Sequence, residues 1–112
     1  MEIIKAEIDD NEILTTITKK SKAYWGYSEN ILREWEQLLT VTKDYIANNQ
    51  VFKLIQNNQI IGYYSYYSID NNTIKLDNLF ILPEFIGKGF GKMLMNDFLK
   101  KHASKRYLQN NT

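Results

Sequence analysis

The chain has 112 residues, 44% hydrophobic and 24% charged, a composition expected of one small globular domain over residues 1–112. Its formal net charge of +1 at pH 7 gives no general attraction to nucleic acids or acidic membranes. With no cysteine and a single histidine, disulfides, cysteine nucleophiles and metal centres are not expected. The N-terminus lacks the basic region and apolar core of a secretory leader, and no stretch is long enough to span a membrane, so we expect a cytoplasmic protein.

The first half of the chain is predicted to be mainly helical. Residues 2–8 are rich in isoleucine and predict a short strand. Asp9 or Asp10 then begins a helix, and if Asp9 is the N-cap, Glu12 falls at the capping-box position. Two further helices are predicted to begin after cap residues, Ser28 and Thr42.

The second half changes to a strand pattern. Residues 51–56, 60–69 and 74–82 are predicted strands joined by the turns NNQ and DNNT, which indicates an antiparallel meander. A closing helix with one apolar face follows from Phe90. This order of elements predicts an α/β (α+β) fold, a mostly antiparallel sheet flanked by helices. Two of the four tyrosines on the middle strand should face the core, and two the ligand side or solvent: Tyr63, Tyr64, Tyr66 and Tyr67.

Three of the five glycines lie in the stretch FIGKGFGK, between the last strand and the closing helix. Glycines allow sharp turns that expose several amides, and a helix N-terminus adds partial positive charge, so this stretch predicts an anion site. A P-loop is excluded, because Gly87 to Gly91 is one residue short and Met93 occupies the position of the metal-binding hydroxyl. The spacing GxGxG after a hairpin also differs from a dinucleotide fingerprint.

The longer stretch LFILPEFIGKGFGKMLMNDFL resembles the acyl-coenzyme A signature of the GNAT-type N-acetyltransferase superfamily. In that signature a strand ending near a proline leads into (Arg or Gln)-x-x-Gly-x-(Gly or Ala) and a helix. The order of the upstream elements also matches, while Ile86 stands where the family usually has Arg or Gln. The resemblance covers nearly the whole chain and implies a GNAT-like acyl-CoA acyltransferase fold.

The resemblance also implies which residues bind acetyl-CoA. The strand backbone would pair with the pantetheine arm and polarise the thioester carbonyl, and the loop amides would hold the pyrophosphate. Lys88 and Lys92 could add charge near the phosphates or be solvated. The implied coenzyme-binding residues are Leu79, Phe80, Ile81, Leu82, Gly87, Lys88, Gly89, Phe90, Gly91 and Lys92.

The chemistry of amine acetylation points to further residues. An alkyl ammonium with a pKa of about 10.4 must lose a proton before it attacks, and Asp77 is the best-placed carboxylate for that role. Alternatively, Asp77 pairs with Lys75 or caps a turn. The resemblance places the acceptor pocket at Tyr24, Trp25 and Tyr27, for which packing in the core at a helix junction is the alternative.

The resemblance further implies that the last strands of the fold are missing. Family members continue with another strand, a helix and a strand pair, whereas here only Tyr107 and Leu108 suggest the next strand. LDNLFIL would then be an exposed hydrophobic edge, through which we expect a homodimer.

Two functions follow from this resemblance. One is an acetyl-CoA-dependent N-acetyltransferase that acts by direct transfer on an amine of a small molecule or peptide. The other is a catalytically inactive acyl-CoA-binding or dimeric interaction module. An interaction domain without a ligand is a third reading, but it leaves the glycine cluster unexplained.

Overall fold

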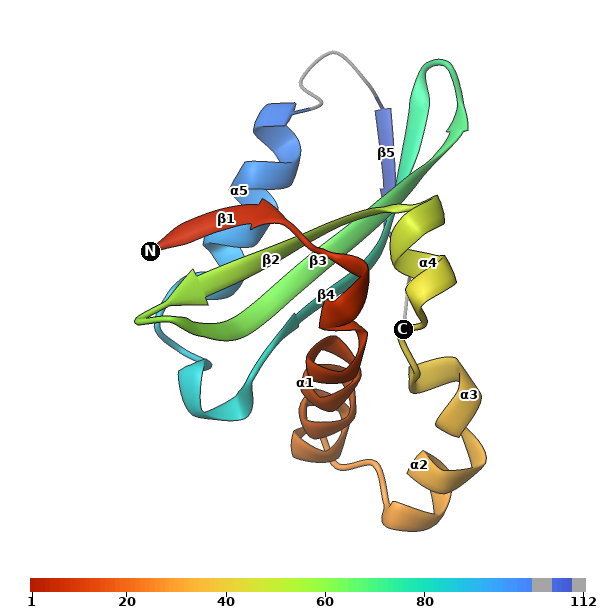
Figure 1. Ribbon diagram of the computed structural model, residues 1–112, viewed down its shortest axis with the longest axis vertical. Coiled ribbons are helices and arrows are strands. Elements are labelled where there is room, and N and C mark those ends of the chain that lie inside the picture. The colour runs from red at the N-terminus through yellow and green to blue at the C-terminus, as the bar shows by residue number, and fades with distance from the viewer. Residues whose placement is uncertain (102–105, 110–112) are drawn as a thin grey trace.

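A twisted five-stranded sheet forms the centre of the computed structural model, which describes residues 1–101 and 106–109 (Figure 1). Its strands follow chain order from one edge to the other. The first four are antiparallel to their neighbours, and the fifth is parallel to the fourth. They are β1 (Glu2–Lys5), β2 (Gln50–Gln56), β3 (Gln59–Asp70), β4 (Thr73–Ile81) and β5 (Arg106–Gln109). The predicted meander and the mostly antiparallel sheet are therefore confirmed.

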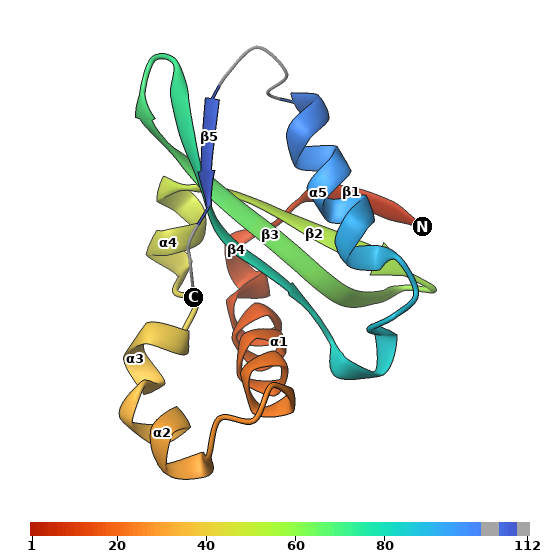
Figure 2. The same ribbon diagram turned by 180° about the vertical axis from the view of Figure 1, so that it is seen from behind.

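Helices cover both faces of this sheet. The α-helices are α1 (Asn11–Tyr24), α2 (Glu29–Glu34), α3 (Glu36–Leu39), α4 (Lys43–Asn48) and α5 (Phe90–Lys101). Two short 3₁₀ turns are η1 (Ile8–Asp10) and η2 (Pro83–Phe85). Helices α1 and α4 lie on one face and α5 on the other, as the front view in Figure 1 and the rear view in Figure 2 show. Among the described residues, no helix combines the length and apolar character that a membrane-spanning segment requires.

The helix starts show which cap predictions hold. Ser28 and Thr42 accept hydrogen bonds from the amides of Ile31 (3.2 Å) and Tyr45 (3.0 Å), so both are confirmed as N-caps. Of the two predicted starts of the first helix, the Asp9 cap is wrong, and Asp10 is the N-cap residue of α1 although its side chain makes no cap bond to that helix. The chain first forms η1, where the Asp10 carboxylate accepts the Glu7 amide at 2.8 Å. The same carboxylate oxygen pairs with a largely buried lysine, Lys53, at 2.7 Å.

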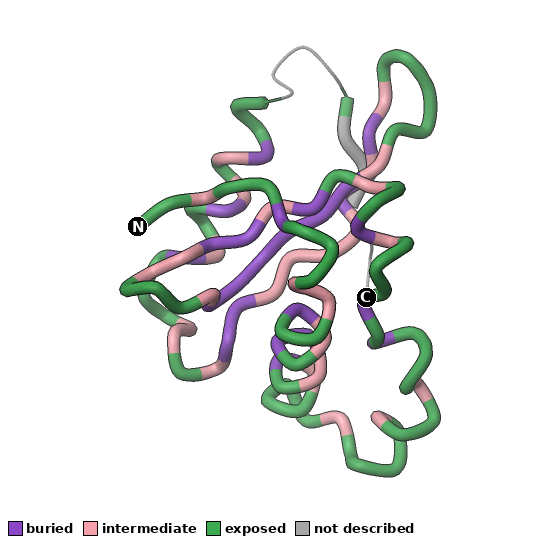
Figure 3. Tube along the Cα trace, in the orientation of Figure 1, coloured by how far each residue is buried: buried purple, intermediate pink, exposed green. Residues whose placement is uncertain are grey.

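Each face of the sheet carries its own hydrophobic core. One core lies under α1 and α4 and includes Tyr63, and the other lies under α5 and includes Tyr64 and Tyr66. Three of the four tyrosines of the middle strand are therefore buried, rather than two, because helices cover both sides. Figure 3 shows buried residues along the central strands and one side of α1, while α2 and α3 are largely exposed.

A close approach between β3 and β4 explains the glycine within β3. A Cβ atom at Gly62 would lie 2.8 Å from the carbonyl oxygen of Phe80 and 2.6 Å from the Ile81 side chain. Any other residue would therefore push the two strands apart. Gly62 fixes the spacing of the strands next to the site described below.

The outer edge of β4 is covered over part of its length. β5 pairs with residues 73–76, so β4 has a neighbour over its first half. Of the stretch LDNLFIL, which we expected to lack a neighbour, only Leu76 is paired in this way within the described part of the chain. Among the described residues, no strand pairs with the outer edge of residues 77–81. Residues 77–80 are only partly exposed and Ile81 is buried. Leu79 and Ile81 pack on the core under α5, and Phe80 packs on the core under α1 and α4.

Candidate active site

A β-bulge in the middle of β4 places two consecutive polar side chains on one face of the sheet. Ser65 of β3 pairs with Asn78 and Tyr66 pairs with Leu76, so Asp77 is the extra residue. A bulge interrupts the alternation of side chains between the two faces of a strand. As a result, Asp77 and Asn78 both reach the side of the sheet that α1 and α4 cover.

These two side chains join a polar network around Tyr45 of α4. The Tyr45 hydroxyl donates a hydrogen bond to the Asp77 carboxylate and lies 2.8 Å from the Ser65 hydroxyl. Asn78 donates from Nδ2 to the Ser65 hydroxyl at 3.0 Å and to the Tyr45 hydroxyl at 3.3 Å. Because Tyr45 gives its hydroxyl proton to Asp77, Ser65 must donate its own to Tyr45. Both hydroxyl protons therefore point toward the Asp77 carboxylate, in the order Ser65, Tyr45, Asp77.

Burial keeps the phenols of this region in their neutral, donating form. Burial is the main reason why the pKa of Tyr45 is raised, and the hydrogen bond to Asp77 raises it further. Burial likewise raises the pKa of Tyr63, against a smaller lowering effect of its bond to Thr18 at 2.6 Å. The Thr18 hydroxyl donates to the Leu14 carbonyl, so Tyr63 is the donor to Thr18.

A pocket of about 270 Å³ opens beside this network. Its floor includes three network residues, Tyr45, Asp77 and Asn78, together with Tyr63 of β3. Its wall includes the end of α3 and the segment that joins α3 to α4. Asp77 is the one formally charged residue among the ten described residues of the lining. These are Thr18, Gln37, Leu38, Leu39, Thr40, Val41, Tyr45, Tyr63, Asp77 and Asn78.

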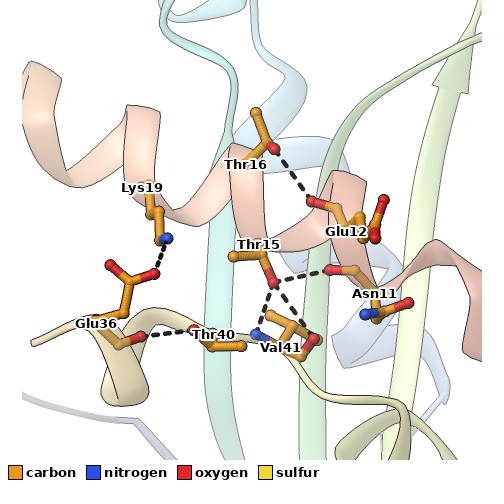
Figure 4. Close-up of polar contacts among 8 residues, drawn as sticks. All are labelled: Asn11, Glu12, Thr15, Thr16, Lys19, Glu36, Thr40 and Val41. Carbon is orange, nitrogen blue, oxygen red and sulfur yellow. Dashed lines mark hydrogen bonds and ion pairs between the residues drawn. The ribbon is translucent and has the colours of Figure 1, made fainter.

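Contacts with α1 hold the wall in place (Figure 4). The Val41 amide donates to the Thr15 hydroxyl of α1 at 2.8 Å, in a partly buried position. Lys19, one turn further along α1, pairs with Glu36 at 2.5 Å. The Thr40 hydroxyl closes the turn by donating to the Glu36 carbonyl at 2.6 Å. The pocket is thus shaped by tertiary contacts between α1 and the segment after α3.

A second feature lies at the end of β4, where η2 leads into the glycine loop and α5. Gly87 and Gly89 have φ angles of 85° and 87°, a left-handed conformation that favours glycine. A Cβ atom at either position would meet nothing within 4 Å, so backbone conformation is the reason for glycine, and the space beside the loop is open. The first helical bond of α5 runs from the Met93 amide to the Gly89 carbonyl at 3.1 Å. The preceding amides therefore have no intrahelical partner and can bind an anion.

This combination of strand, bulge, glycine loop and helix matches a known family. The model of the acetyltransferase (GNAT) family matches residues 14–112. The chain belongs to the GNAT family of acetyltransferases. A search of the curated proteins found no significant match.

Solved GNAT structures share the fold at low sequence identity. The PaiA N-acetyltransferase from Thermoplasma acidophilum, solved with coenzyme A, is 23% identical with a TM-score of 0.79, covering 91% of this chain and 71% of that one. A GCN5-related N-acetyltransferase from Ralstonia eutropha is 14% identical with a TM-score of 0.73, covering 99% and 83%. A Brucella melitensis GNAT acetyltransferase with bound acetyl-CoA is 16% identical with a TM-score of 0.65, covering 91% and 68%. The chain is thus shorter than each of these relatives.

The predicted coenzyme-binding residues of this GNAT protein lie in two segments, residues 79–82 and 87–92, which η2 and Ile86 join. Leu79 packs toward the α5 core and Phe80 toward the α1 core, and Ile81 and Leu82 are buried after them. The loop follows directly, with Lys88 Nζ 5.6 Å from the centre of the Phe85 ring. Phe90 anchors the start of α5 in the core, and Lys92 is exposed. The structure therefore brings the strand and loop residues together. Their contacts with the coenzyme stay a prediction.

The predicted acceptor residues at the end of α1 lie apart from the pocket lining. Tyr24 and Trp25 are 54% and 67% exposed and touch each other edge to face, so they are not part of the core. Tyr27 packs against Trp35, with Lys22 over its ring. Their role in acceptor binding stays a prediction, whereas the predicted base, Asp77, lies in the pocket itself.

Most residues of the pocket lining were not predicted from the sequence. One signal was readable, because the polar pair Asp77 and Asn78 interrupts the apolar alternation of its strand, as a bulge does. Tyr45 and Ser65 had no comparable signal. A tyrosine in a short helix and a serine among tyrosines come together only in the folded chain.

Proposed function

We propose that the chain is an acetyl-CoA-dependent N-acetyltransferase that transfers an acetyl group directly to a primary amine of a small molecule or peptide. One observation carries this function. A single strand, β4, presents a carboxylate at its central bulge and runs through η2 into the glycine loop at the start of α5. The coenzymes bound to the PaiA and Brucella melitensis proteins support the choice of acetyl-CoA.

The residues of the chain fit this coenzyme in two places. The loop from Gly87 to Lys92 offers amides beside open space, and the twelve-residue helix α5 adds partial positive charge at its N-terminus. The outer edge of residues 77–81 has no strand partner among the described residues, so its backbone can pair with an extended amide-containing arm. When bound, acetyl-CoA supplies the activated acetyl thioester.

Asp77 is the group that takes the amine proton. A primary ammonium with a pKa of about 10.4 is almost entirely protonated at neutral pH and cannot act as a nucleophile. Asp77 pairs with the ammonium in the pocket and accepts one of its protons, which leaves a neutral amine that can attack. Tyr45 orients the carboxylate by donating to Oδ2, and its raised pKa keeps it a donor throughout.

Calorimetry with acetyl-CoA and a thiol-release assay over a panel of amines test this function. We expect binding heat and amine-dependent release of the free thiol. Asp77→Asn should lower turnover by roughly 10²-fold or more, as removal of a general base does, while the coenzyme affinity stays the same. No heat at millimolar acetyl-CoA would refute coenzyme binding. Heat without thiol release would instead identify an inactive acyl-CoA-binding module. Unchanged turnover of Asp77→Asn would show that Asp77 is not the base.

The proposed enzyme is taken as one acetyltransferase domain over residues 1–112. The lack of cysteine makes the reducing cytoplasm its expected location.

A further inference from the structure

The charge balance of the pocket restricts what can enter it. Among the described lining residues, Asp77 supplies a negative charge and no lysine, arginine or histidine supplies a positive one. Two lysines of α1 point elsewhere. Lys19 pairs with Glu36, and Lys22 stacks over the rings of Tyr27 and Phe80, at 5.4 and 5.5 Å from their centres.

The remaining lining is suited to a compact, mostly apolar body. Leu38, Leu39 and Val41 contribute aliphatic surface, and Tyr45 and Tyr63 contribute ring faces. The pocket volume of about 270 Å³ is just below the range of roughly 300–1,000 Å³ typical of sites for drug-sized ligands. The space therefore fits a small molecule.

We propose, as an extension of the acetyltransferase function above, that this pocket selects small primary amines with a compact apolar body and no carboxylate or phosphate. Asp77 pairs with the ammonium, and the leucines and tyrosines cover the apolar part. A carboxylate on the acceptor would enter beside Asp77, and none of the described lining residues offers it a cation. Both the lost hydration and the repulsion between like charges then weaken binding. The favoured acceptors are thus decarboxylated relatives of amino acids rather than amino acids.

Matched pairs of ligands test this selectivity by calorimetry or NMR titration, with and without coenzyme A. Phenethylamine and phenylalanine differ by one carboxylate, as do isobutylamine and valine. We expect each amine to bind at least about tenfold more tightly than its amino acid, because an unpaired charged group is costly to bury. Phenethyl alcohol, which keeps the body but lacks the cation, should also bind at least about tenfold more weakly than phenethylamine. Equal or tighter binding of both amino acids, or no binding of either amine, overturns the inference.

Two variants place the selectivity on named residues. Asp77→Asn keeps the shape of the side chain and should weaken the binding of phenethylamine by roughly ten- to a hundredfold. The affinity for phenethyl alcohol should change little. Leu38 lines the pocket yet is 82% exposed, so Leu38→Lys adds a cation to the lining with little cost in packing. This variant should narrow or reverse the preference for phenethylamine over phenylalanine, and Leu38→Gln, a neutral control, should not. An unchanged preference in Leu38→Lys together with unchanged amine affinity in Asp77→Asn contradicts the assignment.

The outcomes separate this inference from the proposed function. Absence of acetyl-CoA binding refutes the acetyltransferase function, whether or not the amines bind in the pocket. Coenzyme binding and amine-dependent thiol release, combined with a preference for the amino acids, refute only the acceptor selectivity.

Discussion

Single side chains in this protein owe their chemistry to burial and to one or two neighbours. Tyr45, Tyr63 and Tyr64 illustrate this, because burial is the main cause that raises the pKa of each phenol. For Tyr64, a hydrogen bond to Asp97 at 2.6 Å contributes as well. Each tyrosine thus remains a neutral donor inside the fold, whereas an unfolded chain exposes it to water.

The raised pKa values of these tyrosines predict a loss of folding stability at alkaline pH. In the unfolded chain tyrosine ionises at a pKa of about 10, while the folded-state pKa values of the three phenols are higher. Below that pH both states hold the protons, and the stabilising contribution is fully present. Above it the unfolded chain releases protons that the folded chain keeps, so the free energy of unfolding falls as pH rises. Urea unfolding from about pH 9 to pH 11 measures this slope, and absorbance of the phenolate follows the ionisation.

A pair of substitutions provides the control. Tyr63→Phe removes a buried phenol while Thr18 keeps its bond to the Leu14 carbonyl, so it should cost about 1 kcal/mol at neutral pH and flatten the alkaline slope. Tyr24→Phe removes a phenol that is 54% exposed and is the matched surface control, with a change in stability at neutral pH within about 0.5 kcal/mol. Identical phenolate titrations of the native and the unfolded protein would contradict the prediction.

At the scale of elements, the helices, strands and glycine loop were largely predictable because their signals are local. Alternating apolar residues, the caps Ser28 and Thr42, and the glycine cluster each act within a few neighbouring residues. The failures arose where a distant partner intervened. The Asp10 carboxylate pairs with Lys53 of β2, and the bulge at Asp77 depends on the register with β3.

The loop offers a direct test of the coenzyme site. Gly89→Val introduces a β-branched residue at a φ of 87°, which strains the backbone by roughly 1–3 kcal/mol or moves the loop amides. We expect acetyl-CoA affinity, measured by calorimetry, to fall at least about tenfold, since amides that change direction no longer converge on a phosphate.

The matched control places the same strain elsewhere. Gly26 in the loop after α1 has a φ of 96° and equally open surroundings, so Gly26→Val should lower stability by a similar amount. It should leave coenzyme affinity unchanged. Wild-type affinity in Gly89→Val, or an equal loss of affinity in both variants, would remove the glycine loop from the binding site.

At the scale of the whole molecule, the sheet separates two cores and leaves one edge half covered. β5 occupies the first half of the outer edge of β4, and residues 77–81 beyond it have no strand partner among the described residues. An uncovered strand edge can pair with another chain. In this GNAT protein the same edge is also the proposed binding site of the pantetheine arm.

This competition predicts ligand-dependent self-association of the 112-residue chain. We expect dimers at high micromolar concentration in sedimentation velocity experiments, paired across residues 77–81 of β4. Saturating coenzyme A should shift the population toward monomers, because both partners need the same backbone groups. A strictly monomeric profile would refute the prediction, and dimers insensitive to coenzyme A would place the interface elsewhere.

The sequence by itself determined the fold class, the order of the elements and the place of the glycine loop. These depend on side-chain periodicity and on the freedom of glycine, which neighbouring residues carry. Only the tertiary structure decided the pocket beside Asp77, the candidate active site. The bulge, the Tyr45–Ser65–Asp77–Asn78 network and the wall held by Thr15 join residues from α1, α4, β3 and β4. Contacts between residues so far apart in the chain arise only when the helices pack on the sheet, which is why no local pattern predicts them.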